Sequence, residues 1–396
     1  MELKVEDKLI LSCIKIFPND SELEKINSLI PHICDWDYLI TTIIERGIGP
    51  LFYIKLSIIS NSQQIPEPVK IKLKQAYYKT FSRSTILYEH FRNIIKVFNL
   101  HTIPVIALKG IFLSEWLYQD IGLRQFSDID LLVKEEDGKR CITILEQLGY
   151  KKQQSDKLSV FVESKFEIVH YPPMTLNGVS IEIHIRLHQN TESYNVIIPQ
   201  LWKSSNKSII NGVQVNSLAI NDLLIYLCLH LDKHFRSGHV QFTCFNDITN
   251  IVDVYSKSID WHAFKLTCRL FKCEDTVFKY LVLIHKYMNA PVPSDIIENY
   301  LSLLTEKDEQ MFFSYLKGNF SSNNYFQTHL KILKNIQELS GKVRYIRDVL
   351  FPSKAFMIQA YQIKHKSLML FYYLYRYYIG LRGVVNYLKK KVVVRK

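Results

Sequence analysis

Two aspartates, Asp128 and Asp130, are the residues whose type and spacing best suit chemistry, and they lie in the otherwise apolar run from Ser127 to Val133. On a strand, alternate side chains share one face, so the two carboxylates would lie about 7 Å apart. Such carboxylates repel each other unless a cation lies between them. Mg²⁺ prefers oxygen ligands and usually keeps waters and substrate phosphates as its others. The run therefore indicates either a Mg²⁺ site or a strand edge with two solvated aspartates.

A third acid, Glu182, lies in the strictly alternating segment 178–186, which predicts a strand. Next to the strand of Asp128 and Asp130, it would add a third carboxylate to the same face. Two divalent metal ions about 4 Å apart use such a triad to clamp the attacking and leaving oxygens of a phosphoryl transfer. The alternative is a polar residue on an exposed face. His184 follows on the same face, where it either touches the site or supports it from the core.

Lys109 and Gly110 end the apolar run 102–108, which predicts a buried strand entering a turn before a helix at 111–118. Glycine lets the backbone approach a ligand closely. The first turn of a helix presents free N–H groups to phosphate, and Lys109 adds a positive charge. Arg124, four residues before Asp128, is a further candidate for phosphate, with a salt bridge as the alternative.

His230 and His234 are spaced by four residues on a predicted helix, so they share one face. Zinc ligands have this spacing, but the intervening residues provide no His-Glu-x-x-His motif. We expect the pair to line the cleft or to form hydrogen bonds within the helical bundle. The sequence contains no Ser-His-Asp or Cys-His arrangement with local spacing and no glycine-rich nucleotide loop. Hydrolase and dinucleotide-binding functions therefore have no support.

The order of the predicted elements gives an α/β core between two helical regions. Residues 1–98 read as helices. Strands at 102–108, 128–133, within 157–171 and at 178–186 alternate with helices and predict a small mixed sheet, and from about Gln200 helices return. The expected regions are an N-terminal helical region at 1–98, the core at 99–200, a helical domain at 201–320 and a basic, aromatic C-terminal helical region at 321–396.

The net charge of +12 comes mostly from the C-terminus. Residues 349–396 contain ten of the 50 Lys and Arg and no acid, so residues 1–348 carry 40 basic against 38 acidic groups. Nucleic acid is therefore not a favoured partner. The aromatic, basic tail suits a membrane surface or an anionic partner, and the alternative is burial of a helix beyond about residue 364. We favour burial, with Phe371, Leu374 and Tyr378 largely covered.

Seven irregularly spaced cysteines indicate free thiols rather than a disulfide framework. The N-terminus lacks the positive and then apolar segments of a signal peptide, and no uncharged apolar run reaches about 18 residues. We expect a cytoplasmic protein, with membrane association through the C-terminus as the alternative location.

These motifs resemble the uncharacterised nucleotidyltransferase family, which belongs to the DNA polymerase beta-like nucleotidyltransferase superfamily. The residues that carry the resemblance are Leu108-Lys109-Gly110, Gly122-Leu123-Arg124, Ser127 to Val133 and Ile181-Glu182-Ile183-His184, followed more weakly by Leu227 to His230, His234, Asp247-Ile248 and Phe351-Pro352-Ser353.

The resemblance implies a minimal nucleotidyltransferase sheet at the core, with Asp128 and Asp130 as metal ligands. It makes Glu182 the third acid, and a candidate base for an acceptor hydroxyl. Lys109, Gly110, Arg124 and Ser127 would be nucleotide-binding residues. The superfamily usually has Gly-Ser at the turn where this chain has Lys109-Gly110, and Ser114 lies a helical turn further on.

The expected function is transfer of a nucleotidyl group from an NTP such as ATP to an acceptor hydroxyl or phosphate, with two Mg²⁺ ions as cofactors. The acceptor is a small molecule, a peptide or a protein, and the sequence does not distinguish these. The altered turn motivates the alternative, a catalytically inactive protein of the same fold that acts as a binding or accessory factor in a biosynthetic pathway.

Overall fold

The computed structural model describes residues 3–153, 169–188, 194–237, 241–318, 339–352 and scattered positions between 333 and 381. It forms two compact units. The first comprises Met1–Lys151 and Val169–Asn319, and the second comprises Lys152–Ile168 and Phe320–Lys396. All the candidate site residues fall within the first unit.

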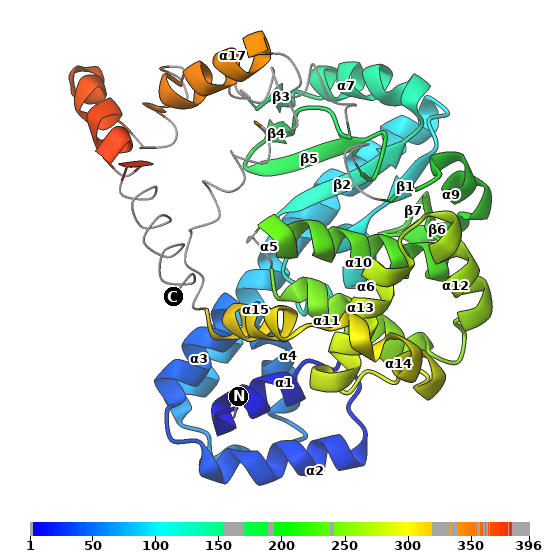
Figure 1. Ribbon diagram of the computed structural model, residues 1–396, viewed down its shortest axis with the longest axis vertical. Helices are drawn as coiled ribbons and strands as arrows, with labels where there is room; N and C mark the ends of the chain where they lie inside the picture. Colours follow the sequence, from blue (N-terminus) through cyan, green and yellow to red (C-terminus); the bar gives the residue numbers. More distant parts are fainter. Residues whose placement is uncertain are drawn as a thin grey trace. The chain divides into compact units, whose positions relative to one another are not determined.

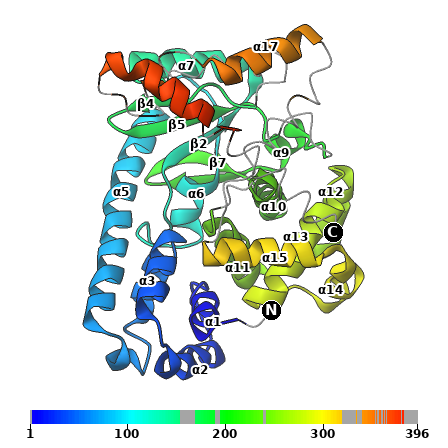
Figure 2. The same cartoon turned by 60° about the vertical axis from the view of Figure 1, so that its left-hand side comes forward.

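The N-terminal region is helical, which confirms the expectation for it. Its helices are α1 (Val5–Ser12), α2 (Asp20–Leu29), α3 (Trp36–Glu45), α4 (Gly49–Lys55) and α5 (Glu67–Leu100), with short 3-10 turns η1 (Ile30–His32) and η2 (Ser62–Gln64). A capping box between Asn19 and Glu22 fixes the start of α2. The 34-residue α5 contacts α3 and α4 and then β2, β5 and β7, so it connects the N-terminal helices to the sheet (Figure 2).

The core of the first unit is a seven-stranded mixed sheet with the order β3-β4-β5-β2-β1-β7-β6 (Figure 1). Its strands are β1 (Val105–Ala107), β2 (Asp128–Val133), β3 (Lys151–Lys152), β4 (Met174–Leu176), β5 (Val179–His184), β6 (Asn206–Ile210) and β7 (Val213–Ser217). β2 and β5 are parallel, as are β1 and β7, whereas β1 and β2 are antiparallel. The α/β core with a mixed sheet is thus confirmed.

The hairpin of β6 and β7 corrects one expectation, because after the short helix at Ile198–Ser204 the chain forms two more strands before the helices continue at Ile220. Asn211 and Gly212 form its turn, with φ angles of 47° and 72°. Consecutive residues with positive φ are what a tight hairpin turn requires, and Asn-Gly is the usual sequence for it. β7 pairs with β1 and so extends the sheet beyond residue 200. The strand expected within 157–171 mostly falls on residues 154–168, outside the described part of the chain.

Helices pack around this sheet and continue beyond it (Figure 1). They are α6 (Lys109–Trp116), α7 (Gly138–Gln147), α9 (Ile198–Ser204), α10 (Ile220–Ser237), α11 (Thr243–Tyr255), α12 (Trp261–Leu270), α13 (Glu274–Met288), α14 (Ser294–Tyr300) and α15 (Glu306–Lys317), with 3-10 turns η3 (Glu135–Asp137) and η4 (Leu301–Leu303). Helices α10, α11 and α13 contact one another. The ring of Phe312 in α15 packs against Phe242, Phe245 and Tyr287.

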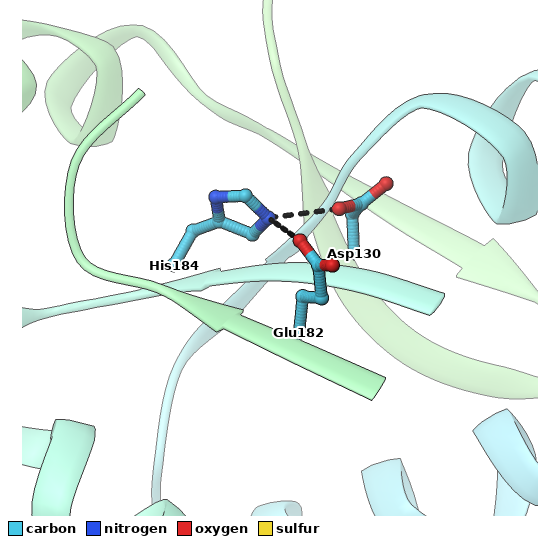
Figure 3. Close-up of side chains that lie close together, drawn as sticks. All are labelled: Asp130, Glu182 and His184. Carbon is cyan, nitrogen blue, oxygen red and sulfur yellow. Dashed lines mark hydrogen bonds and ion pairs between the residues drawn. The ribbon is translucent and has the colours of Figure 1, made fainter. Parts of the chain in front are cut away.

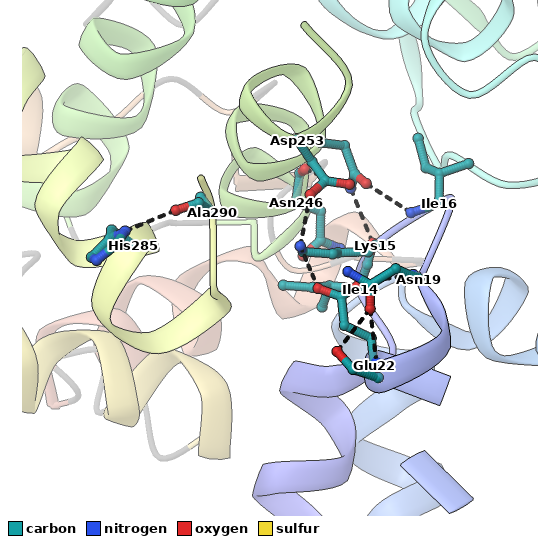
Figure 4. Close-up of polar contacts among 11 residues, drawn as sticks. Ile14, Lys15, Ile16, Asn19, Glu22, Asn246, Asp253, His285 and Ala290 are labelled. Atoms are coloured by element: carbon teal, nitrogen blue, oxygen red, sulfur yellow. Dashed lines mark hydrogen bonds and ion pairs between the residues drawn. The ribbon is translucent and has the colours of Figure 1, made fainter. Parts of the chain in front are cut away.

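Polar contacts attach the N-terminal segment to α11 (Figure 4). The Lys15 ammonium pairs with Asp253 at 2.7 Å and with Glu22 of α2. The buried Asn250 side chain accepts a hydrogen bond from the Ile16 N–H and donates one to the Ile14 carbonyl. The N-terminal helices are therefore anchored on the helix that follows α10.

The second unit contains α17 (Leu339–Leu350), η5 (Lys366–Leu368) and a helix at 369–378. The helix confirms one expectation for the tail, but the burial predicted for its apolar side chains is wrong: Phe371 is 63% exposed, Leu374 59% and Tyr378 61%. Among the described residues, none of the helices has the length and apolarity needed to cross a bilayer. All seven cysteines are free thiols, as expected.

Candidate functional site

The register of β2 and β5 brings the predicted acids together. These strands are parallel, and Asp130 lies opposite Glu182 while Leu132 lies opposite His184. Ile129 and Leu131 on β2 are fully buried on the other face. Because side chains alternate along a strand, the polar residues of both strands project from one face of the sheet.

Asp130, Glu182 and His184 form a compact polar cluster on this face (Figure 3). The Nε2 atom of His184 lies 2.8 Å from Oδ1 of Asp130 and 3.5 Å from Oε2 of Glu182, so the imidazole points at both carboxylates. One ligand atom from each residue lies within 4.8 Å of the other two. The donor set therefore fits a divalent cation, with two carboxylates and one imidazole available to it.

Lys109 occupies the other side of Asp130. Its Nζ atom lies 3.1 Å from Oδ2 of Asp130, so each oxygen of this carboxylate has a cationic or N–H partner. Tyr226 of α10 lies beside the same ammonium. The Leu108 N–H donates to the Asp130 carbonyl at 3.1 Å, which fixes the start of α6 against β2. Lys109 thus points into the acidic cluster.

The two aspartates differ in their electrostatics. Burial disfavours the charge of Asp130, but Lys109 and His184 overcome it and hold the pKa of that carboxyl well below its usual range. Burial and the neighbouring Asp130 charge together raise the pKa of Asp128 to about 6, although Lys109 opposes this rise. Hydrogen bonds to Asp130 and Glu182 raise the pKa of His184 although burial opposes its charge. His184 also lowers the pKa of Glu182 against the effect of burial.

Gly110 lies in the first turn of α6, and Ser127 directly precedes Asp128 at the start of β2. A Cβ atom on Gly110 would lie 2.6 Å from the Phe126 ring, so this position has no room for a larger residue. The Ser127 hydroxyl donates to Oδ1 of Asp128 at 3.5 Å, and its carbonyl accepts a hydrogen bond from Arg83. Ser114 is fully buried within α6, away from the turn.

Arg124 pairs with an aspartate other than Asp128 or Asp130. Its guanidinium makes a two-pronged pair with Asp247 of α11, at 2.8 Å from Nε to Oδ1 and 2.6 Å from Nη2 to Oδ2. The Tyr118 hydroxyl donates to the same carboxylate. The salt-bridge alternative for Arg124 is therefore realised with a partner that lies 123 residues away in the sequence.

One face of α10 carries an aromatic series that includes the predicted histidines. The rings of His230 and His234 are 4.4 Å apart, and Tyr226 lies one turn before them at 6.1 Å from His230. Burial lowers the pKa of His230, and the Lys109 charge lowers it further. The charges of Lys109 and Asp130 both act on His230, and the lowered pKa favours its neutral imidazole.

Sequence reasoning missed two residues of the site, His170 and Tyr226. His170 forms an isolated bridge with His184, and its Nδ1 atom lies 4.0 Å from Oε2 of Glu182. Tyr226 could have been found from its spacing, because Tyr226, His230 and His234 recur every four residues on one helix. His170 gave no comparable signal, since it lies in the segment 157–171, whose loose alternation predicted a strand but marked no residue for the site.

A cavity of about 700 Å³ begins where β2 and β5 end. Its lining starts at Lys134, one residue past β2, and at Ile185, one residue past His184. Tyr194 and Trp202 provide aromatic walls. A cavity of this size is in the range that accommodates small-molecule ligands.

The sequence matches the uncharacterised nucleotidyltransferase family over residues 33–289, which is more than half of the chain. The chain belongs to this family, and it is accordingly a transferase of the nucleotidyltransferase class. The family assignment agrees with the mixed sheet and with the acids on β2 and β5.

The chain also has a likeness to the solution structure of the antibiotic-resistance factor ANT(2'')-Ia, with 14% sequence identity and a TM-score of 0.35. The match covers 52% of this chain and 99% of that one. None of the curated proteins compared with the chain matches it. The assignment to the nucleotidyltransferases rests on the family match.

Proposed function

We propose that this protein transfers a nucleotidyl group from an NTP to an acceptor hydroxyl or phosphate in a Mg²⁺-dependent reaction. The observation that carries the proposal is the register of β2 against β5, which places Asp130 opposite Glu182 on the strand that also carries Asp128. Three acids on one face of two central strands are costly for a fold unless they bind a cation. The family to which the chain belongs supports nucleotidyl transfer in general.

Asp128, Asp130 and Glu182 would hold the metal through their carboxylate oxygens, which are the ligands that Mg²⁺ prefers. When bound, divalent metal would neutralise charge on the phosphates and favour the attack of the acceptor oxygen. His184 contributes an N–H that aligns Asp130 and Glu182. An imidazole ligand would shift the preference toward Mn²⁺, so comparing the two ions also tests the role of His184.

In the proposed reaction the acceptor oxygen attacks the α-phosphorus, and the bond to the β-phosphate oxygen breaks so that pyrophosphate leaves. The proton of an acceptor hydroxyl passes to a carboxylate. Glu182 is the candidate for this base, as the family resemblance implies.

Lys109, Gly110, Arg124 and Ser127 are the proposed nucleotide-binding residues, and their surroundings support them unequally. Lys109 points into the acidic cluster and is suited to a phosphate. The Phe126 ring fills the space beside Gly110, so the support for Gly110 is its place in the first turn of α6, where free N–H groups can face a phosphate. Arg124 is already paired with Asp247, so a phosphate contact would have to compete with two short hydrogen bonds.

The decisive experiment incubates the protein with each of the four α-labelled NTPs, Mg²⁺ and a cell extract, and then locates the label. Thermal melts with metal and nucleotide measure binding in parallel. The wild type should show a metal-dependent nucleotide shift and transfer of label, and Asp128→Asn should lose both. Asp295→Asn is the matched control, because it neutralises an exposed aspartate on α14.

Absence of a metal-dependent shift with all four NTPs would contradict the proposal, as would its retention in Asp128→Asn. Metal-dependent nucleotide binding without label transfer or pyrophosphate release would favour the alternative, an accessory protein that keeps the fold without turnover. The altered turn at Lys109 is the feature that motivates this alternative.

We also propose a cytoplasmic location, with peripheral membrane contact through the C-terminal tail as the rival arrangement. The exposed side chains of Phe371, Leu374 and Tyr378 support contact with another surface. The basic residues from Lys389 onward lie outside the described part of the chain. Flotation with anionic vesicles tests the contact: salt-sensitive binding that is lost on deleting 389–396 would support it, and absence of binding would exclude it.

A further inference from the structure

The Lys109 ammonium lies where a cation would have to bind. It contacts Oδ2 of Asp130 at 3.1 Å, while His184 holds the other oxygen of the same carboxylate. Its positive charge also acts on Asp128. A metal ion that used Asp130 as a ligand would therefore compete directly with an internal cation.

The backbone holds Lys109 in this place. Its φ angle of 45° is in the left-handed region, which is uncommon for residues other than glycine. The residue before it is hydrogen-bonded to the Asp130 carbonyl, and the residue after it packs against the Phe126 ring. The Lys109 side chain is 17% exposed, so its charge is partly removed from water. A strained backbone that aims a lysine at an acidic cluster points to a function for that lysine.

We propose that Lys109 is a displaceable cation, which pairs with Asp130 in the free protein and transfers to the nucleotide's phosphates when metal and nucleotide bind together. This inference rests on the proposed function and specifies its binding order. Metal alone has to displace Lys109 and leave a poorly hydrated ammonium without a partner, which is costly. A metal–nucleotide complex provides both the cation for Asp130 and a phosphate for Lys109. The protein should therefore bind metal weakly in the absence of nucleotide and tightly in its presence.

The rival interpretation is a permanent ion pair with a structural role. The two interpretations predict opposite effects of removing the charge. If Lys109 competes with metal, its neutral replacement improves metal binding in the absence of nucleotide. If Lys109 only stabilises the fold, its replacement lowers stability and leaves metal affinity unchanged or weaker.

The test measures Mn²⁺ binding to the full chain by electron paramagnetic resonance, with and without a non-hydrolysable ATP analogue. Lys109→Met removes the charge and keeps the length of the side chain. Lys279→Met is the matched control, because Lys279 is similarly exposed at 20% and pairs with Asp308 at 3.5 Å and with the buried Asp232 at 3.9 Å, outside the acidic cluster. Lys109→Asn is a second variant, since asparagine tolerates the left-handed conformation, and thermal melts establish that each variant is folded.

Without nucleotide, both Lys109 variants should bind Mn²⁺ at least about tenfold more tightly than the wild type, since a neighbouring positive charge is gone. The analogue should tighten Mn²⁺ binding in the wild type and in Lys279→Met, but much less in the Lys109 variants. Unchanged or weaker Mn²⁺ binding by folded Lys109 variants would overturn the inference. If the Lys109 variants give that result but nucleotide still tightens Mn²⁺ binding in the wild type, only the inference about Lys109 is contradicted and the proposed function is retained. If nucleotide has no effect on Mn²⁺ binding in the wild type, both are overturned.

Discussion

Asp128 and Asp130 are the same residue type two positions apart, yet the fold shifts their pKa values in opposite directions. Asp130 is buried but has Lys109 and His184 as partners, which hold its pKa low. Asp128 is half-buried and has the Ser127 hydroxyl as its hydrogen-bond donor, so burial and its neighbour raise its pKa to about 6. The repulsion within the acidic cluster thus falls mainly on Asp128, which is the position where a cation would relieve it.

The first prediction concerns the stability of Asp128→Asn in the presence of a chelator. In the wild type, the folded-state pKa of about 6 lies above the ordinary aspartate value of 3.8, so the folded state binds more protons between these pH values. The free energy of unfolding therefore falls as the pH rises through this window. Asp128→Asn removes that loss, so it should match the wild type near pH 4 and exceed it by about 1–3 kcal/mol at pH 7.5.

Urea unfolding at several pH values between 4 and 7.5 measures this difference. Asp295→Asn provides the comparison, because it neutralises an exposed aspartate on α14, outside the acidic cluster. A variant that is less stable than the wild type at pH 7.5 would show that Asp128 has a structural role instead. A difference that does not change with pH would exclude the proposed repulsion.

The second prediction is that Gly110→Ala destabilises the fold by about 1–3 kcal/mol, since an inserted methyl group has to push the Phe126 ring aside. Gly380→Ala is the control, because a Cβ there meets nothing within 4 Å. Adding Phe126→Leu should recover part of the loss by making room. Thermal unfolding measures all three variants, and a Gly110→Ala protein as stable as the wild type would contradict the argument.

At the scale of elements, local patterns predicted the strands that carry the acids but not how those strands pair. The Asp-x-Asp run and the alternation around Glu182 define β2 and β5 from the sequence, because the period of two is a local property. Their parallel register is a non-local outcome of packing. The Arg124–Asp247 pair was likewise out of reach, since its partners are 123 residues apart. The β6–β7 hairpin was missed although its Asn-Gly turn is a local signal.

The third prediction tests the pair that ties the loop before β2 to α11. Arg124→Met should cost about 3–5 kcal/mol, because it leaves the Asp247 carboxylate buried without its cation. Adding Asp247→Leu should restore most of that loss, because neither charge then remains buried alone. A double-mutant cycle on the free energy of unfolding measures the coupling.

Additive losses in that cycle would contradict the structural role of the pair. If the double variant folds stably, it also tests the phosphate contact proposed for Arg124. Nucleotide affinity that stays unchanged would assign Arg124 to structure, and a large loss would support the contact.

At the scale of the molecule, α11 connects regions that are distant in the sequence. Asp247 receives Arg124 and Tyr118 from the sheet region, and Asn250 and Asp253 receive the segment before α2. These contacts lie within two turns of one helix. The family match begins at residue 33, so the segment at 14–16 that contacts α11 lies before it. The N-terminal helices therefore support the helix that positions Arg124.

The fourth prediction follows from Asn250, whose fully buried side chain bonds to the Ile16 N–H at 2.8 Å and to the Ile14 carbonyl at 3.0 Å. Asn250→Ala leaves the Ile16 N–H and the Ile14 carbonyl without their hydrogen-bond partner. It should therefore lower the free energy of unfolding by roughly 2–4 kcal/mol. The matched control is Asn299→Ala, which removes a hydrogen bond to the carbonyl four residues earlier on an exposed face. Hydrogen exchange should show faster exchange of the Ile16 amide in Asn250→Ala alone. If that amide stays protected and stability is unchanged, the N-terminal segment is held by its apolar contacts and α11 does not anchor it.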